Sequence, residues 1–186
     1  MKKLSLRTRV LTGTIAATAL AAGTFGAVSA NAATPAAAPA AAVAKADAEN
    51  KNTMESTHLT IEAATKAAQA TLDAAEKENQ RVSVAVVDRN GNTLVTLRGD
   101  GAGPQSYEAA QKKAYTAVSW NAPTSELAKR LANAPTLKDI PGTLFLGGGA
   151  PLTAKGAPIA GIGVAGAPSG DLDEKFAQAG VATLGK

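Results

Sequence analysis

A strand, a tight turn and the start of a helix follow one another in residues 161–174, which read Gly161-Ile162-Gly163-Val164-Ala165-Gly166-Ala167-Pro168-Ser169-Gly170-Asp171-Leu172-Asp173-Glu174. Ser169 is a typical N-cap, and acids in the first turn of a helix are stabilised by its free N–H groups. Asp171 and Glu174 lie three residues apart, which places them on one face of that helix. They either act as first-turn acids alone or also bind a hard cation.

The glycines of this run have the Gly-x-Gly-x-x-Gly spacing of a dinucleotide-binding loop, at Gly161, Gly163 and Gly166. Such a loop opens directly into a helix, whereas here Pro168 interrupts the turn. A second glycine run, at residues 147–149, lacks the Lys-Ser/Thr pair of a phosphate-binding loop. The glycines therefore predict tight turns and close packing of the strand, and we reject a nucleotide site.

A β-hairpin precedes this run in the chain. Val82–Val87 is β-branched and apolar on both faces, which is typical of an interior strand. Asn90-Gly91 is the strongest local signal for a hairpin turn, and Thr93–Arg98 returns as the second strand. Further strands are predicted at Thr143–Leu146, ended by the glycines at 147–149, and at Ile159–Val164.

Helices complete the predicted domain. The first is capped by Thr60 and runs to about Asn79, with an apolar stripe formed by Ile61, Ala64, Ala68, Leu72 and Ala75. The others run from about Gln105 to Trp120, from a Thr124 cap through Leu131, and from Asp171 to about Ala182. Because helices and hairpins are interleaved without regular strand–helix alternation, we expect one α+β domain with a mainly antiparallel sheet.

The N-terminal part has a different composition. Residues 1–32 combine a basic start, an apolar alanine-rich run and the small residues Ala30-Asn31-Ala32. This is the pattern of a cleaved secretory signal peptide, with an uncleaved membrane anchor as the alternative. Residues 33–55 are rich in Ala and Pro, which predicts a disordered leader. The protein is therefore expected to be secreted, with its domain in residues 56–186.

The charge of the chain depends on that signal peptide. The full sequence has 19 Lys and Arg residues against 15 Asp and Glu, and the excess of four bases lies within residues 1–32. The remainder has no net charge, so its composition gives no reason to expect nucleic acid as a partner. The sequence has no cysteine, which excludes disulfides, thiolate catalysis and cysteine-ligated metal sites.

His58 is the sole histidine of the chain. It lies at the edge of the leader, a poor place for the base of a Ser/His/Asp hydrolase. It is either a solvated histidine or a ligand of metal or haem. The other ligands for a cofactor are Met54, Tyr107, Tyr115 and hydroxyl groups, so a bound haem is expected to have weak oxygen-type or open ligation.

Several short blocks follow one another in the chain: Val84–Gly91, Lys112-Lys113-Ala114, Pro141-Gly142-Thr143, Gly147-Gly148-Gly149 and residues 163–174. In this order they resemble the GlcG/HbpS family. Together the resemblance covers residues 58–185. It implies a five-stranded antiparallel sheet flanked by helices and assembly into a homo-oligomer, expected to be an octamer. It also implies extracellular binding of haem b and iron ions, redox sensing, and partnership with a membrane sensor histidine kinase of a two-component system.

The resemblance also implies roles for individual residues. Thr143 corresponds to the residue nearest the haem iron, where its hydroxyl is a weak ligand. The implied metal-binding residues are an acidic surface pair, Asp171 and Glu174; half of a second pair, Glu108, whose partner position holds Gln111; and His58. We therefore expect a haem- and redox-sensing accessory protein without catalytic residues. A haem-degrading protein and an oligomeric interaction protein with incidental haem binding remain the alternatives.

Overall fold

An antiparallel sheet of four strands forms the centre of the computed structural model, which describes residues 47–185. The strands are β1 (Ser83–Asp88), β2 (Thr93–Arg98), β3 (Gly149–Ala154) and β4 (Ala157–Ala165). Their order across the sheet is β2-β1-β4-β3, and each neighbouring pair is antiparallel. The predicted signal peptide and most of the predicted leader lie outside the described residues.

The helices agree closely with the expected ones. They are α1 (Ile61–Lys77), α2 (Pro104–Trp120), α3 (Thr124–Lys129) and α4 (Gly170–Ala182), with short 3-10 helices η1 (Asn50–Asn52), η2 (Arg130–Ala132) and η3 (Pro135–Asp139). Thr60 and Ser169 are N-caps, as predicted, because their hydroxyls accept from backbone N–H groups of the first turn. The predicted Thr124 cap is wrong: Thr124 is the first residue of α3, and its hydroxyl accepts from Gly149 N instead.

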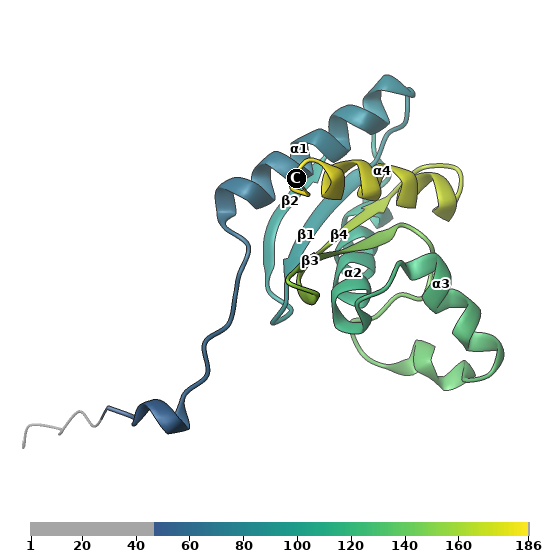
Figure 1. The fold of residues 1–186 in the computed structure, drawn as a ribbon. Coiled ribbons are helices and arrows are strands. Elements are labelled where there is room, and N and C mark those ends of the chain that lie inside the picture. The colour runs from purple at the N-terminus through teal and green to yellow at the C-terminus, as the bar shows by residue number, and fades with distance from the viewer. Residues whose placement is uncertain (1–46, 186) are drawn as a thin grey trace, which may run out of the picture. The chain divides into compact units, whose positions relative to one another are not determined.

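The helices cover the two faces of the sheet. Helices α1 and α4 lie side by side on one face, and α2 crosses the other (Figure 1). Alternate residues of the inner strands point to opposite faces, so Val84 and Val86 pack under α1 and α4, while Ala85 packs under α2. The prediction of one α+β domain with an interior strand at β1 is confirmed.

The glycines of β4 let α2 lie very close to the sheet. A Cβ atom on Gly163 would overlap the carbonyl oxygen of Ala110, and one on Gly161 would overlap that of Ala114. The residues that alternate with these glycines, Ile162 and Val164, are fully buried in the core on the opposite face. The predicted close packing of this strand is thus confirmed, and each face of β4 has its own role.

The expectation of five strands is wrong for residues 47–185, which form four. Thr143–Leu146 is irregular, because Leu144 N donates to the Thr116 hydroxyl of α2 and not to a neighbouring strand. Phe145 packs edge-on against Trp120, with ring centroids 5.2 Å apart. The strand lies instead at β3, which begins at the last glycine of the run and does not end before it. Pro151 hides this strand in the sequence, since proline cannot donate to a ladder. It is tolerated here because β3 is an edge strand.

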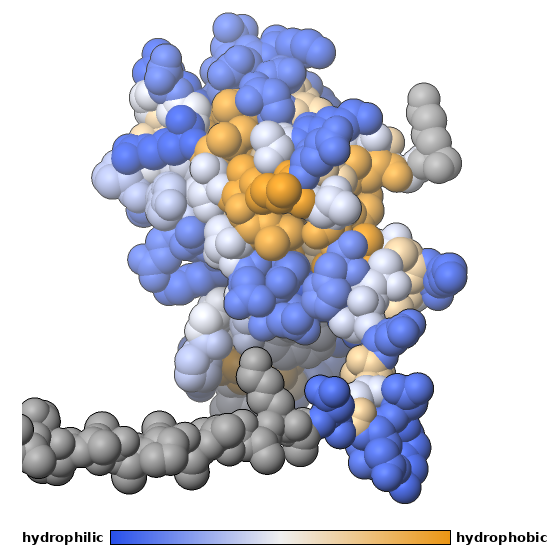
Figure 2. All heavy atoms as spheres, turned by 90° about the vertical axis from the view of Figure 1, so that its left-hand side faces the viewer, coloured by the Kyte–Doolittle hydropathy of each residue, from blue (hydrophilic) through white to orange (hydrophobic). Residues whose placement is uncertain are grey.

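Apolar side chains are also exposed on the side of the domain that carries β2. Figure 2 views this side and shows an apolar area bordered by hydrophilic residues. Within edge strand β2, Leu94, Val95 and Leu97 are half-buried. Ile61, expected in the buried stripe of the first helix, is 60 % exposed. None of the helices within residues 47–185 has the length and apolar character needed to cross a bilayer.

Candidate functional site

Thr143 lies in the irregular connection between η3 and β3, residues 140–148. Its hydroxyl donates to the carbonyl oxygen of Ile140 at 2.7 Å, and its backbone N–H points to the same oxygen at 3.3 Å. The residue is half-buried, and Ile140 is 41 % exposed. Within the described residues, the Thr143 hydroxyl accepts no hydrogen bond, so its lone pairs are available to a ligand.

Open hollows flank this connection on the surface. Leu144 lines one together with residues of the first half of α2, namely Gln105, Glu108, Ala109 and Lys112. Leu146, which is 53 % exposed, lines two more beside the starts of α3 and α4. An apolar edge with nearby polar and cationic groups is thus available next to Thr143.

These residues fit a weakly held haem of open ligation. The connection offers a neutral hydroxyl oxygen at Thr143 and exposed apolar side chains at Ile140 and Leu146. Lys112 lines the adjoining hollow and pairs there with Glu108, so its charge is shared with that carboxylate. His58 is exposed before α1, and its Nε2 atom lies 2.6 Å from Ser56 Oγ. That Thr143 lies nearest the iron stays a prediction from the resemblance.

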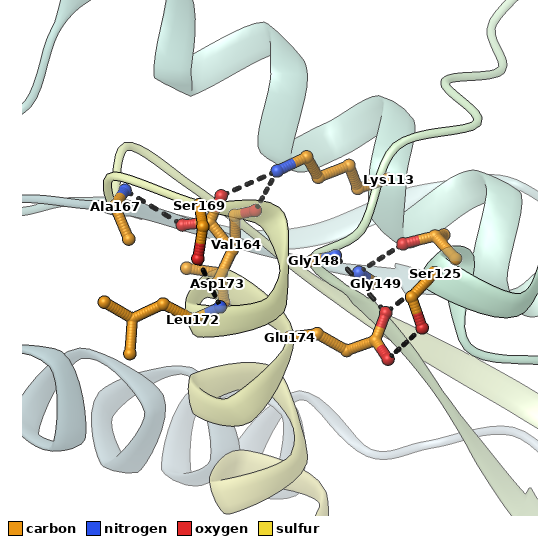
Figure 3. A network of polar contacts seen from close by, with 11 residues as sticks. Lys113, Ser125, Gly148, Gly149, Val164, Ala167, Ser169, Leu172, Asp173 and Glu174 are labelled. Atoms are coloured by element: carbon orange, nitrogen blue, oxygen red, sulfur yellow. Dashed lines mark hydrogen bonds and ion pairs between the residues drawn. The ribbon is translucent and has the colours of Figure 1, made fainter. Parts of the chain in front are cut away.

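The predicted acidic pair on α4 is divided between solvent and interior. Asp171 is exposed, but Glu174 is only 7 % exposed. The Glu174 carboxylate accepts hydrogen bonds from Ser125 N at 2.9 Å and Ser125 Oγ at 2.6 Å, and a longer one from Gly148 N. Glu174 thus joins the start of α3 to the glycine run (Figure 3), and it is not the surface acid that the resemblance implies.

The acid between them, Asp173, forms the most buried ion pair of the domain as described. Lys113 Nζ lies 2.7 Å from Asp173 Oδ2 and donates to Val164 O at 2.9 Å, while Ala167 N donates to Asp173 Oδ1 at 3.0 Å (Figure 3). Burial raises the pKa of the Asp173 carboxyl, and the hydrogen bond and charge of Lys113 oppose that rise. This pair connects α2 to the turn between β4 and α4.

Glu108 and Gln111 form contacts with different partners. Glu108 is exposed and pairs with Lys112 at 2.7 Å, and this hydrogen bond and the lysine charge lower the pKa of Glu108. The Gln111 amide donates to Thr96 Oγ1 on β2 instead. Among residues 47–185, no three His, Asp or Glu side chains gather as a metal site would require. Iron binding by Asp171, Glu174, Glu108 or His58 stays a prediction.

Sequence reasoning missed Lys113, Asp173, Ser125 and Thr116 as residues that shape the site. Two of them had a signal in the sequence. Lys113 lies on the face of α2 that also carries the buried Ala110 and Ala117, and a lysine there needs a buried partner. Asp173, four residues after the Ser169 cap, is the first-turn acid that faces the sheet. The hydroxyls of Thr116 and Ser125 had no local signal.

Comparison with known proteins identifies the family. Residues 59–182 match the family model described as haem degrading protein HbpS-like. The crystal structure of a double mutant of HbpS from Streptomyces reticuli is 75 % identical, covers 78 % of this chain and 99 % of its own, and superimposes with a TM-score of 0.77. The complex of PduOC with haem is 29 % identical, covers 68 % of this chain and 94 % of its own, and has a TM-score of 0.62.

A further relative is similar over most of its own length. An uncharacterised 15.0 kDa protein from the dhaT-dhaS intergenic region of Citrobacter freundii is 34 % identical over 122 residues, which are 63 % of this chain and 85 % of the relative. The family match spans α1 through α4, and therefore every element that builds the site. The chain belongs to the HbpS-like family.

Proposed function

We propose that this protein is a secreted haem- and iron-binding protein that acts as a redox- and haem-sensing accessory to a membrane sensor histidine kinase. The observation that carries the haem assignment is the exposed apolar pair Ile140 and Leu146 in the connection that holds Thr143. The similarity of this chain to the solved complex of PduOC with haem supports it. Secretion is supported by the composition of residues 1–32. The kinase partner is an expectation drawn from the resemblance to the family.

The chain supplies binding and orientation, and haem b would supply the redox-active iron. Thr143 offers a neutral oxygen, a much weaker ligand than imidazole or thiolate. Ile140 and Leu146 would contact apolar parts of the bound haem, and Lys112 would attract its carboxylates in exchange for Glu108. An open iron held by one weak oxygen suits sensing or scavenging better than efficient electron transfer.

We expect Thr143→Ala to weaken haem binding about tenfold, the scale of one lost ligand or hydrogen bond. An absorbance titration of purified protein with haemin measures the Soret band and its affinity. Thr153→Ala is the matched control, because Thr153 is an exposed threonine on β3, away from the connection. A wild-type protein without a Soret band would overturn the haem assignment, and equal titrations for both variants would remove Thr143 from it.

The iron proposal is best tested at Asp171, since Glu174 has a structural role. We expect Asp171→Asn to lower the affinity of the haem-free protein for ferrous or ferric ions by roughly fivefold or more, with the haemin titration unchanged. Glu62→Gln is the control, an exposed acid in the first turn of α1. Equal iron affinity in wild type and Asp171→Asn would show that the start of α4 acts as a capped helix end alone.

Haem degradation is the second candidate, favoured by the description of the family. It is distinguished by adding reductant to the haem-loaded protein with catalase present. Loss of the Soret band with stoichiometric product supports degradation, and a stable band supports sensing.

Size-exclusion chromatography of the same samples tests the proposed octamer. If a pull-down recovers the same amount of kinase with and without haem or iron, the alternative of an oligomeric interaction protein with incidental haem binding is favoured.

A further inference from the structure

Side chains from three helices hold the connection that carries Thr143. Its backbone forms no strand, so the N–H groups that find no acceptor within the connection need one from another segment. Leu144 N donates to Thr116 Oγ1 of α2, Gly148 N to Glu174 of α4, and Gly149 N, at the start of β3, to Thr124 Oγ1 of α3. Of these three acceptors, Thr116 is the one that binds the residue directly after Thr143.

The hydroxyl of Thr116 is held in one orientation. The residue is fully buried, and its hydroxyl donates to Lys112 O at 2.7 Å. Because a hydroxyl has only one proton, the remaining lone pairs are acceptors, and Leu144 N lies 2.8 Å from the oxygen. Without this oxygen, the Leu144 N–H would lack an acceptor in a half-buried site.

The neighbouring residue on α2, Tyr115, supports the same connection on the other side of Thr143. The ring of Tyr115 lies against Gly142, since a Cβ on that glycine would meet the ring at 3.7 Å. The opposite edge of the ring lies against Gly91 in the β1–β2 turn. Thr143 is thus bracketed by two residues, Gly142 and Leu144, that both contact consecutive residues of one rigid helix.

We propose that Thr116 is a positioning residue for Thr143: its buried hydroxyl binds the backbone N–H of Leu144 and so fixes where the Thr143 hydroxyl lies on the surface. The effect on a ligand rests on the proposed haem function, but the effect on the connection does not. Thr116 itself is fully buried, so it acts through Thr143.

The test replaces the hydroxyl with a methyl group, in Thr116→Val, which keeps the shape of the side chain. In the haem-free protein, amide hydrogen exchange at Leu144 is expected to be about tenfold faster. With haemin, the dissociation constant is expected to rise about tenfold, and the absorption and electron paramagnetic resonance spectra to approach those of Thr143→Ala. Thr116→Ser, which keeps the acceptor, is expected to show the wild-type exchange rate at Leu144 and the wild-type haemin affinity.

Thr71→Val is the matched control. Thr71 is also a fully buried helical threonine whose hydroxyl donates to the carbonyl four residues earlier, at 2.8 Å, but it lies on α1 across the sheet from α2. It is expected to change neither the Leu144 exchange nor the haem spectra. Should Thr116→Val fail to fold, Thr116→Ala removes the same acceptor with less bulk.

The double variant Thr116→Val/Thr143→Ala separates positioning from general damage. If Thr116 acts through Thr143, the double variant binds haemin as Thr143→Ala alone does. A further loss in the double variant, or unchanged exchange at Leu144 in Thr116→Val, overturns the positioning role. If wild type gives no haem band, the proposed function fails, and the exchange at Leu144 then decides by itself whether Thr116 fixes the connection.

Discussion

Lys113→Met is expected to lower the free energy of unfolding by about 3–5 kcal/mol, the range for breaking a buried ion pair on one side. The Lys113 and Asp173 side chains are only 3 % and 4 % exposed, so the variant leaves a carboxylate buried without its counter-charge. It also removes the donor to Val164 O at the end of β4. Urea unfolding followed by circular dichroism measures the change.

The adjacent residue provides the control. Lys112 also forms an ion pair, with Glu108, but those side chains are 41 % and 71 % exposed. Lys112→Met is expected to leave the free energy of unfolding nearly unchanged, because water screens an exposed pair on a helix. Equal effects of the two substitutions would contradict the structural role of the buried pair. Lys113→Met with Asp173→Leu is expected to recover much of the loss, since no charge is then buried.

Gly163→Ala is expected to destabilise the domain by about 3 kcal/mol or more, or to prevent folding. The added methyl group would overlap the backbone carbonyl of Ala110, and a helix backbone cannot turn aside as a flexible side chain can. Relief requires α2 to move away from the sheet, which disturbs the packing of Ala85 and Ala114. Thermal and urea unfolding measure this loss.

Gly185→Ala is the control for the effect of an alanine on the unfolded chain. Gly185 is exposed, and a Cβ there would meet its nearest atom, Val181 O, at an ordinary 3.9 Å. The free energy of unfolding of Gly185→Ala is expected to differ from that of the wild type by about 0.5 kcal/mol or less, as for most surface substitutions. A Gly163→Ala protein as stable as Gly185→Ala would mean that α2 does not approach β4 as closely as described.

Local signals predicted the local structure well. Asn90-Gly91 placed the hairpin, and the Thr60 and Ser169 caps placed the starts of α1 and α4, because these features depend on neighbouring residues alone. The strand at β3 was missed for the opposite reason. Pro151 is acceptable only on an edge strand, and which strand lies at the edge depends on pairing across the whole sheet.

The acids of α4 show the same limit in the candidate site. The spacing of Asp171 and Glu174 predicted a shared surface, but Glu174 turns inward because Ser125 and Gly148 offer it three N–H and O–H donors. Those donors come from segments 26 and 49 residues away in the chain. A periodic pattern on one helix gives the angular position of each side chain and says nothing of what covers it.

By itself, the sequence of residues 161–174 specified a strand of small residues, a turn and a capped helix, since chain geometry and hydrogen bonding between near neighbours suffice for these. Tertiary structure decided the rest. It packed Gly161 and Gly163 against the backbone of α2. It also paired Asp173 with Lys113 and placed the Glu174 carboxylate where it accepts from Gly148 N. Buried charges and close backbone contacts need partners from distant segments, and only the folded chain brings those together.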